Sequence, residues 1–143
     1  MLAGWAVFRL LGAAGVMPAA DSWTAALRFA LSVMFLFTAG SHFVPRTRAD
    51  LVRMVPPALP NPAILVMATG VLELLGAIGL LVPSTVKLSA YALIALLVAM
   101  FPANISAAQR QLTIAGRPAT PLAIRLPMQL FWIGALWWTA SAR

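Results

Sequence analysis

The amino-acid sequence predicts an all-α fold: a polytopic transmembrane four-helix bundle with an N-terminal interfacial or partial helix. Of its 143 residues, 62% are hydrophobic and 9% are charged. Soluble domains carry roughly 25% charged residues because their surface faces water, and disordered chains are poor in hydrophobic residues. The composition excludes both classes. Four apolar segments also have about the 20 residues that a helix needs to cross a bilayer, so we expect an integral membrane protein.

Residues 1–22 form the N-terminal element. The apolar run at 2–17 is short for a membrane span and carries Arg9 in its middle, whereas a signal peptide has its positive charge before the apolar region. We expect a helix that lies in the membrane interface or packs on the bundle, with Trp5 and Arg9 one turn apart. A fifth, partial span is the alternative.

Residues 23–143 are expected to form the bundle. Residues 45–61 contain four prolines and charges of both signs, which predicts a loop because proline disfavours helix in the residue before it. Residues 107–120 are polar and contain a glycine and a proline, so we expect a second loop there. Residues 83–84 alone separate the second and third apolar segments, which predicts a tight antiparallel hairpin. The four spans are expected at about 23–44, 62–82, 85–105 and 121–140.

Basic residues set the expected orientation. The side that holds the two long loops carries five of them and the side that holds both termini carries three: Arg46, Arg48, Arg53, Arg110 and Arg117 against Arg9, Lys87 and Arg143. By the positive-inside rule, residues 45–61 and 107–120 face the cytoplasm of a bacterial-type cell and both termini lie outside. The net charge of +7 is scattered singly between apolar runs, so it predicts contact with membrane lipids and not with nucleic acid.

The chain has no cysteine and one histidine, His42. It therefore cannot form a disulfide or hold an iron–sulfur cluster through thiolates, and a single histidine predicts no metal site. The sequence contains no hydrolase triad, phosphate-cradling loop or dinucleotide fingerprint. We expect no intrinsic cofactor, and at most the role of an oxidoreductase subunit that works with a borrowed one.

Glu73 lies in the middle of the second apolar segment, where an ionisable group costs about 2.5–3.5 kcal/mol unless it has a partner. Its neighbours three and four residues away are all small, which lets another helix approach: Thr69, Gly70, Gly76 and Ala77. Glu73 is therefore expected to face the bundle interior. Two interpretations remain open, a structural salt bridge with Arg28 or Arg125, or a carboxylate that binds a ligand or handles protons.

Other polar residues share helix faces. One face of the first span carries an arginine and the histidine, and one face of the fourth carries an arginine, a glutamine and Trp132. The third span ends in an asparagine two residues after Pro102. These faces predict a polar pocket that opens toward the long loops. Its candidate ligand-binding residues are Glu73, His42, Asn104, Arg125, Gln129 and Arg28.

Most of these candidates also have a purely structural interpretation. Arg28 and Arg125 lie close enough to span ends to reach water as membrane anchors. For His42, residue type and depth favour a cap at a span end over a catalytic base. For Asn104, they favour a partner for the backbone that Pro102 loosens over a ligand contact.

Three sequence motifs point to a known family: FTAGSHF at 37–43, TGVLELLGAIGLLVP at 69–83 and MFPANISAA at 100–108. Together they resemble the DoxX-like membrane proteins, over roughly residues 25–140. The resemblance implies a four-helix membrane bundle. It also implies a link either to thiosulfate:quinone oxidoreductase and quinol oxidase chemistry or to assembly roles. The site residues that it carries over are Gly40, His42, Glu73, Pro102 and Asn104.

Three functions are consistent with these features. The first is a membrane subunit that binds a quinone or similar lipid-soluble molecule in the service of a redox system. The second is an assembly protein that docks other membrane proteins, or further copies of itself, without chemistry of its own. The third is a small transporter, which broken helices in corresponding halves of the chain would favour, although only Pro102 and Pro127 interrupt the expected spans.

Overall fold

The computed structural model describes residues 1–114 and 116–141, and within them the chain folds into six α-helices. The all-α prediction is therefore confirmed. Arg143, counted above for the orientation, lies outside the described residues. A short 3-10 turn, η1, precedes α2, and two strands of two residues, β1 and β2, pair antiparallel before α6. The elements are α1 (Leu2–Ala13), η1 (Pro18–Ala20), α2 (Trp23–Gly40), α3 (Pro45–Met54), α4 (Pro62–Gly79), α5 (Val86–Gln109), β1 (Thr113–Ile114), β2 (Arg117–Pro118) and α6 (Leu122–Ser141).

Three of the described helices are long and apolar enough to cross a membrane: α2, α4 and α5, with mean hydropathies of 1.4, 1.8 and 1.9. Large apolar side chains point outward from them, and Phe37, Ile64 and Leu88 are 85%, 65% and 72% exposed. Such a surface suits lipid and not water, which supports a membrane protein. α6 has 20 residues but is not one of the three; Arg125 and Gln129 place polar groups in its first half.

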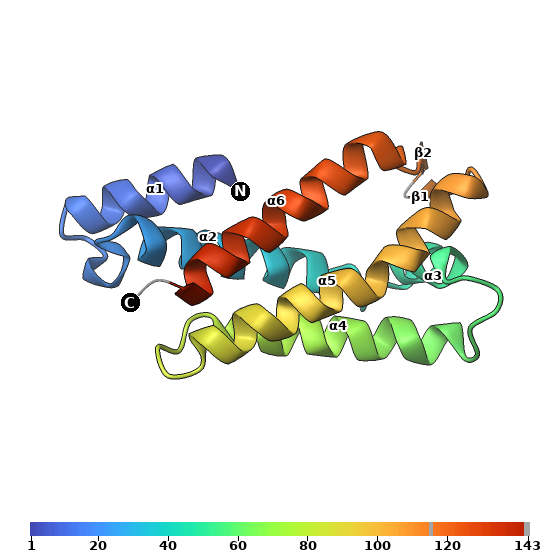
Figure 1. Ribbon diagram of the computed structural model, residues 1–143, viewed down its shortest axis with the longest axis horizontal. Coiled ribbons are helices and arrows are strands. Elements are labelled where there is room, and N and C mark those ends of the chain that lie inside the picture. Colours follow the sequence, from blue (N-terminus) through green and yellow to red (C-terminus); the bar gives the residue numbers. More distant parts are fainter. Residues whose placement is uncertain (115, 142–143) are drawn as a thin grey trace.

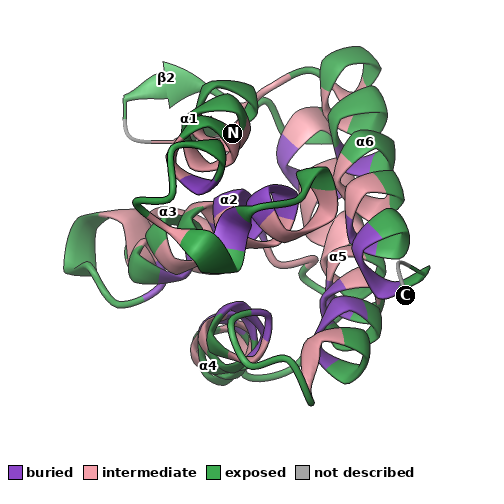
Figure 2. Ribbon diagram, turned by 90° about the vertical axis from the view of Figure 1, so that its left-hand side faces the viewer, coloured by how far each residue is buried: buried purple, intermediate pink, exposed green. Residues whose placement is uncertain are grey.

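The helices are arranged around α2, which lies near the centre of the end-on view (Figure 2). α2 packs on α4, α4 on α5, α5 on α6 and α6 on α2, so these four helices form a closed ring. Figure 1 shows α3, the β-hairpin and residues 55–61 at one end of the molecule, and the turn between α4 and α5 at the other. The most deeply buried large side chains, each at most 1% exposed, are those of Leu27, Leu31, Leu80, Leu93 and Leu136.

Polar caps and prolines set the helix ends. Ser22 begins α2, because its Oγ accepts a hydrogen bond from Ala25 N at 3.0 Å. Pro62 occupies the first turn of α4, where its missing N–H is no loss. The connection between α4 and α5 extends over residues 80–85, beyond the predicted two residues, and Thr85 Oγ1 closes it by donating to the last carbonyl of α4 at 2.8 Å.

The prediction of a continuous loop at residues 45–61 is wrong, because Pro45–Met54 form α3. Pro45 stands in the first turn, which proline tolerates. Thr47 Oγ1 ties this turn to the end of α2 by donating to Ser41 O at 2.6 Å. The proline-rich part breaks the helix only after Met54. The second predicted loop, residues 107–120, also begins late, since α5 continues to Gln109.

α1 packs along α2 and is anchored by aromatic side chains. At 1.5 Å per residue its 12 residues extend over about 18 Å, well short of a bilayer core. Trp5 Nε1 donates to Trp23 O at 2.8 Å. The Trp5 ring also meets the rings of Trp23 and Trp138 edge to face, at centroid distances of 5.7 and 5.8 Å. Trp5 therefore joins α1 to both α2 and α6.

The chain reverses direction between α1 and α2. Gly12 lies directly against the backbone of Ala20 and Asp21 there, with no room for a Cβ atom. Arg9 Nη1 pairs with Asp21 at 3.1 Å on the surface of the same turn. Because α1 runs back along α2, its first residues lie beside the middle of α6 (Figure 1).

Candidate functional site

Glu73 and His42 meet where α2 packs on α4. Glu73 projects from α4 and is 4% exposed, and His42 lies in the turn after α2 and is 8% exposed. His42 Nε2 is 3.4 Å from Glu73 Oε2, and Thr38 Oγ1 donates to Glu73 Oε1 at 2.5 Å. Glu73 therefore faces the interior, as its small neighbours predict.

The hydrogen bond of His42 to the backbone of α4 orients its ring toward Glu73. His42 Nδ1 lies 2.8 Å from Val66 O, and because a carbonyl oxygen only accepts, the bonding pattern assigns a hydrogen to Nδ1. His42 Nε2 is then the ring nitrogen that faces Glu73 Oε2, at 3.4 Å. Each buried polar group thus has a polar partner, which lowers the cost of its burial.

Glycines allow the helices to approach closely enough for this contact. A Cβ atom at Gly70 would lie 2.5 Å from His42 Cβ and 2.8 Å from its Cγ. At Gly76, a Cβ atom would lie 2.6 Å from the Leu93 side chain of α5. Small residues around Glu73 therefore bring α4 against α2 on one side and against α5 on the other.

Two of the other candidates lie elsewhere in the molecule. Gln129 Nε2 donates to Leu97 O at 3.0 Å and so links α6 to α5. The Arg28 guanidinium carbon lies 5.4 Å from the ring centroid of Phe29, and its buried Nε has no hydrogen-bond partner among the described residues. The structure thus separates these two side chains from the Glu73–His42 pair.

The remaining two candidates, Arg125 and Asn104, are half-buried and make no side-chain hydrogen bond to any described residue. Within the described part of the chain, the ion-pair partner of Glu73 is His42. The salt bridge considered for Glu73 with Arg28 or Arg125 is therefore not formed, because His42 and Thr38 occupy its two oxygens.

The Glu73–His42 pair is enclosed by protein. Neither residue lines the groove between α1 and α6 or the cavity beside the last turns of α5. Over residues 1–114 and 116–141, no three histidine, aspartate or glutamate side chains come together as a metal site. Because its polar atoms bond one another, the cluster holds α2 against α4.

Thr38 and the carbonyl of Val66 complete the cluster and were not among the predicted residues. A sequence signal exists for Thr38 but not for the carbonyl of Val66, since every residue carries one. Thr38 precedes His42 by four residues, a spacing that predicts a shared helix face. A hydroxyl one turn before the histidine was therefore recognisable as a partner for the buried acid.

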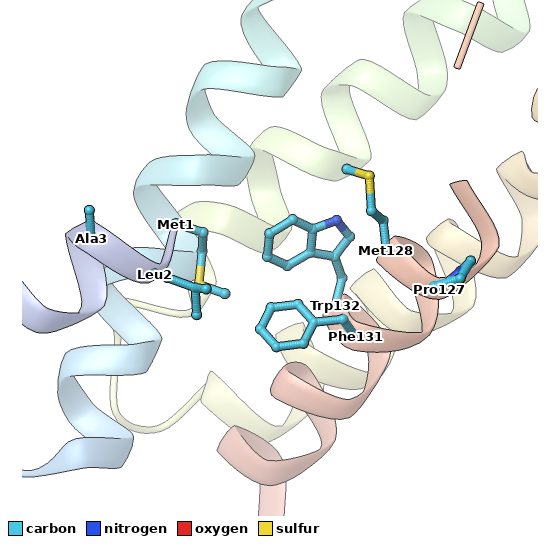
Figure 3. Close-up of a pocket in the computed structure, with 7 residues that line it drawn as sticks. All are labelled: Met1, Leu2, Ala3, Pro127, Met128, Phe131 and Trp132. Carbon is cyan, nitrogen blue, oxygen red and sulfur yellow. The ribbon is translucent and has the colours of Figure 1, made fainter. Parts of the chain in front are cut away.

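An open groove lies between the first residues of α1 and the middle of α6 (Figure 3). Its volume is about 640 Å³, and it is lined by residues 1–3 together with Pro127, Met128, Phe131 and Trp132. The side chains are apolar apart from the indole N–H of Trp132. The rings of Phe131 and Trp132 meet edge to face with centroids 5.1 Å apart. This lining suits an apolar molecule of ordinary ligand size.

No curated protein and no solved structure matches the chain. A family model does match residues 31–140. This range includes Glu73, His42 and the α6 side of the groove, but not α1. Since the match covers well over half of the chain, the protein belongs to the family described as "Domain of unknown function (DUF8561)".

Proposed function

We propose that α2, α4, α5 and α6 form a four-helix transmembrane bundle of the DoxX-like kind, with α3 and the β-hairpin on the cytoplasmic side. The closed ring of these helices supports this arrangement. α6 has 20 residues, which extend over about 30 Å and match a bilayer core. Gln129, the polar residue nearest the middle of α6, donates a hydrogen bond to Leu97 O of α5, so its amide group does not face lipid unpaired.

Within that bundle, we infer that the protein binds a quinone or a similar lipid-soluble molecule and serves a redox system as a membrane subunit. The observation that carries this function is the open apolar groove between α1 and α6. Its size is typical of ligand sites, and Trp132 supplies a ring face and an N–H for a quinone ring and its carbonyl oxygen. A groove beside a spanning helix admits molecules directly from the bilayer.

This function assigns different tasks to the two features. The Glu73–His42 pair stabilises the bundle, and the ligand contacts belong to Trp132 and its neighbours. Gln129 lies three residues before Trp132, so it holds the same stretch of α6 in register against α5.

Replacing Trp132 with alanine is expected to weaken the binding of a short-chain ubiquinone by roughly tenfold or more, because a ring contact and an N–H donor are lost together. Isothermal titration calorimetry on the full chain in mild detergent measures this dissociation constant. The matched control is Trp137→Ala on the same helix, since Trp137 packs edge to face on Tyr91 and does not line the groove. Equal affinities of the two variants, or a purified protein whose lipid extract holds no quinone, would contradict the proposal.

Assembly without chemistry is the second function, and a separate observation favours it. Glu73, His42 and Gln129 already have partners inside the chain, so they offer little to a ligand. Phe37 on α2 is 85% exposed and is available to another membrane protein or to a second copy. For this function Phe37→Ala should lower the retained complex by about fivefold in native mass spectrometry, whereas the melting temperature should not change. Unchanged complex formation together with measurable quinone binding would exclude it.

A further inference from the structure

A second cavity lies at the end of the molecule that carries α3, between residues 55–61 and the last turns of α5. Its volume is about 290 Å³. Prolines and Ile105 form an apolar wall, and Ser106, Gln109 and Arg110 add polar side chains. No residue of the groove or of the Glu73–His42 pair takes part, so this cavity is a separate site.

Pro102 lines this cavity. The bend that this proline introduces into α5 makes space for the cavity. A proline inside a helix removes one backbone hydrogen bond and crowds the preceding turn, which bends the helix. Figure 1 shows the last turns of α5 leading away from α4. The cavity lies between these turns and the connection that precedes α4.

Ser106 is a buried polar group without a partner. It is 7% exposed, and its Oγ has no hydrogen-bond partner among the described residues. A buried hydroxyl without a partner is destabilising, so this group favours the binding of a molecule that can bond it. With a single side-chain torsion that decides where its hydroxyl points, Ser106 readily turns Oγ toward an occupant of the cavity that it lines.

Arg110 supplies a fixed positive charge at the same place. Its backbone N–H donates to Ser106 O at 3.0 Å, and its Nη1 donates to Arg53 O at 2.8 Å. A guanidinium group has five N–H donors, so most of them remain for a ligand. The next two carbonyls of α5 also accept backbone hydrogen bonds. The partial negative charge of this helix end is therefore offset by its caps and by Arg110.

The charge around the cavity favours an anion. Asp50, the acid on α3, pairs with Arg53 through Oδ1. The other two acids of the chain are Glu73, which is paired with His42, and Asp21, which lies in the turn before α2. Arginine is suited to phosphate because its planar fork binds two oxygens at once. The same end carries Arg46, Arg48, Arg53, Arg110 and Arg117.

We propose that this cavity binds the phosphate group of a small phosphate ester. Arg110 and Ser106 hold the phosphate oxygens, Gln109 donates from the rim, and the proline wall contacts the adjoining glycerol or alkyl part. Two sources present this chemistry, the headgroup of an anionic phospholipid and a soluble phosphate ester. The headgroup is in reach because the cavity lies just past the end of the third expected span, at about residue 105.

Native mass spectrometry of the full chain tests the lipid source, by comparing bound phosphatidylglycerol with bound phosphatidylcholine. Arg110→Gln is expected to lower the bound phosphatidylglycerol by about tenfold, because a charge-assisted contact is lost. Ser106→Ala should lower it several-fold while leaving the melting temperature of the lipid-free protein unchanged or higher. Arg46→Gln, an exposed arginine of the same end, is the control for charge and should retain full binding.

Glycerol 3-phosphate tests the soluble source, as a rise in the melting temperature of the protein in neutral detergent. A rise that Ser106→Ala abolishes, without selectivity for phosphatidylglycerol, assigns the cavity to a soluble ester. Since Arg110→Gln also removes the contact with Arg53, the serine variant is the decisive one. The proposal fails if neither phosphate compound binds, or if both bind to the Ser106→Ala protein as they do to the unchanged protein.

Discussion

Replacing Glu73 with alanine is expected to lower the free energy of unfolding by about 3–5 kcal/mol, the usual cost of removing one partner of a buried ion pair. The change leaves His42 Nε2, which now faces the carboxylate, without a partner. It also leaves the Thr38 hydroxyl with only its longer bond to Phe35 O. Because both lie on the α2 side, the loss falls on the packing of α2 against α4. Titration of the protein in mild detergent with sodium dodecyl sulfate, followed by circular dichroism, measures it.

Two control variants make this result specific to burial and pairing. Glu73→Gln keeps an oxygen for Thr38 and nearly the same volume, so its loss should be clearly smaller than that of Glu73→Ala. Asp21→Ala breaks the ion pair with Arg9, in which the aspartate side chain is 62% exposed, and exposed pairs contribute at most about 1 kcal/mol. If Glu73→Ala cost no more than Asp21→Ala, the pair would have no structural role.

Gly70→Ala is expected to destabilise the protein by about 1–3 kcal/mol, the typical cost of overpacking a close contact. The added Cβ would lie 2.5 Å from His42 Cβ, so His42 has to move away from Val66 O and Glu73. The same titration measures the effect. In a double-mutant cycle, a combined loss smaller than the sum of those of Glu73→Gln and Gly70→Ala would show that both losses pass through His42.

Gly134→Ala is the matched control for that variant. Gly134 also lies inside a helix, α6, and a Cβ atom there would meet nothing within 4 Å. Alanine restricts the unfolded chain more than glycine does, so Gly134→Ala should stabilise by about 0.5–1 kcal/mol. The two substitutions are chemically identical and should differ in sign, and a stabilising Gly70→Ala would contradict the close approach of His42.

The long helices are predictable from the sequence, because an apolar segment of about span length satisfies its backbone hydrogen bonds in a membrane by forming a helix. α3 was missed because its charged residues and its flanking prolines resemble a loop, although Pro45 is well placed in a first helical turn. The small neighbours of Glu73 correctly predicted its burial. They could not identify its partner, which depends on how far α2 extends beside α4.

The two cavities depend on features that a single sequence does not show. The groove exists because α1 turns back along α2 and reaches α6, whereas the length and composition of residues 1–22 indicate only a short apolar helix. Trp132 shares the face of α6 that carries Arg125 and Gln129, and the structure places it in the lining of the groove. Ser106 carried no sequence signal, since a serine in a helix commonly bonds its own backbone.

The reversal of the chain before α2 has a consequence for the width of the groove. Two contacts hold α1 in place. Trp5 anchors its first half, near the groove, and Gly12 anchors its C-terminal end. A rigid helix transmits a tilt along its whole length, so a bulkier residue at Gly12 would displace Met1 and Leu2, about 15 Å away along the axis. A substitution at Gly12, in the last turn of α1, therefore acts on the opening beside Trp132 from a distance, and natural variation at this position can change the width of the groove without any substitution in its lining.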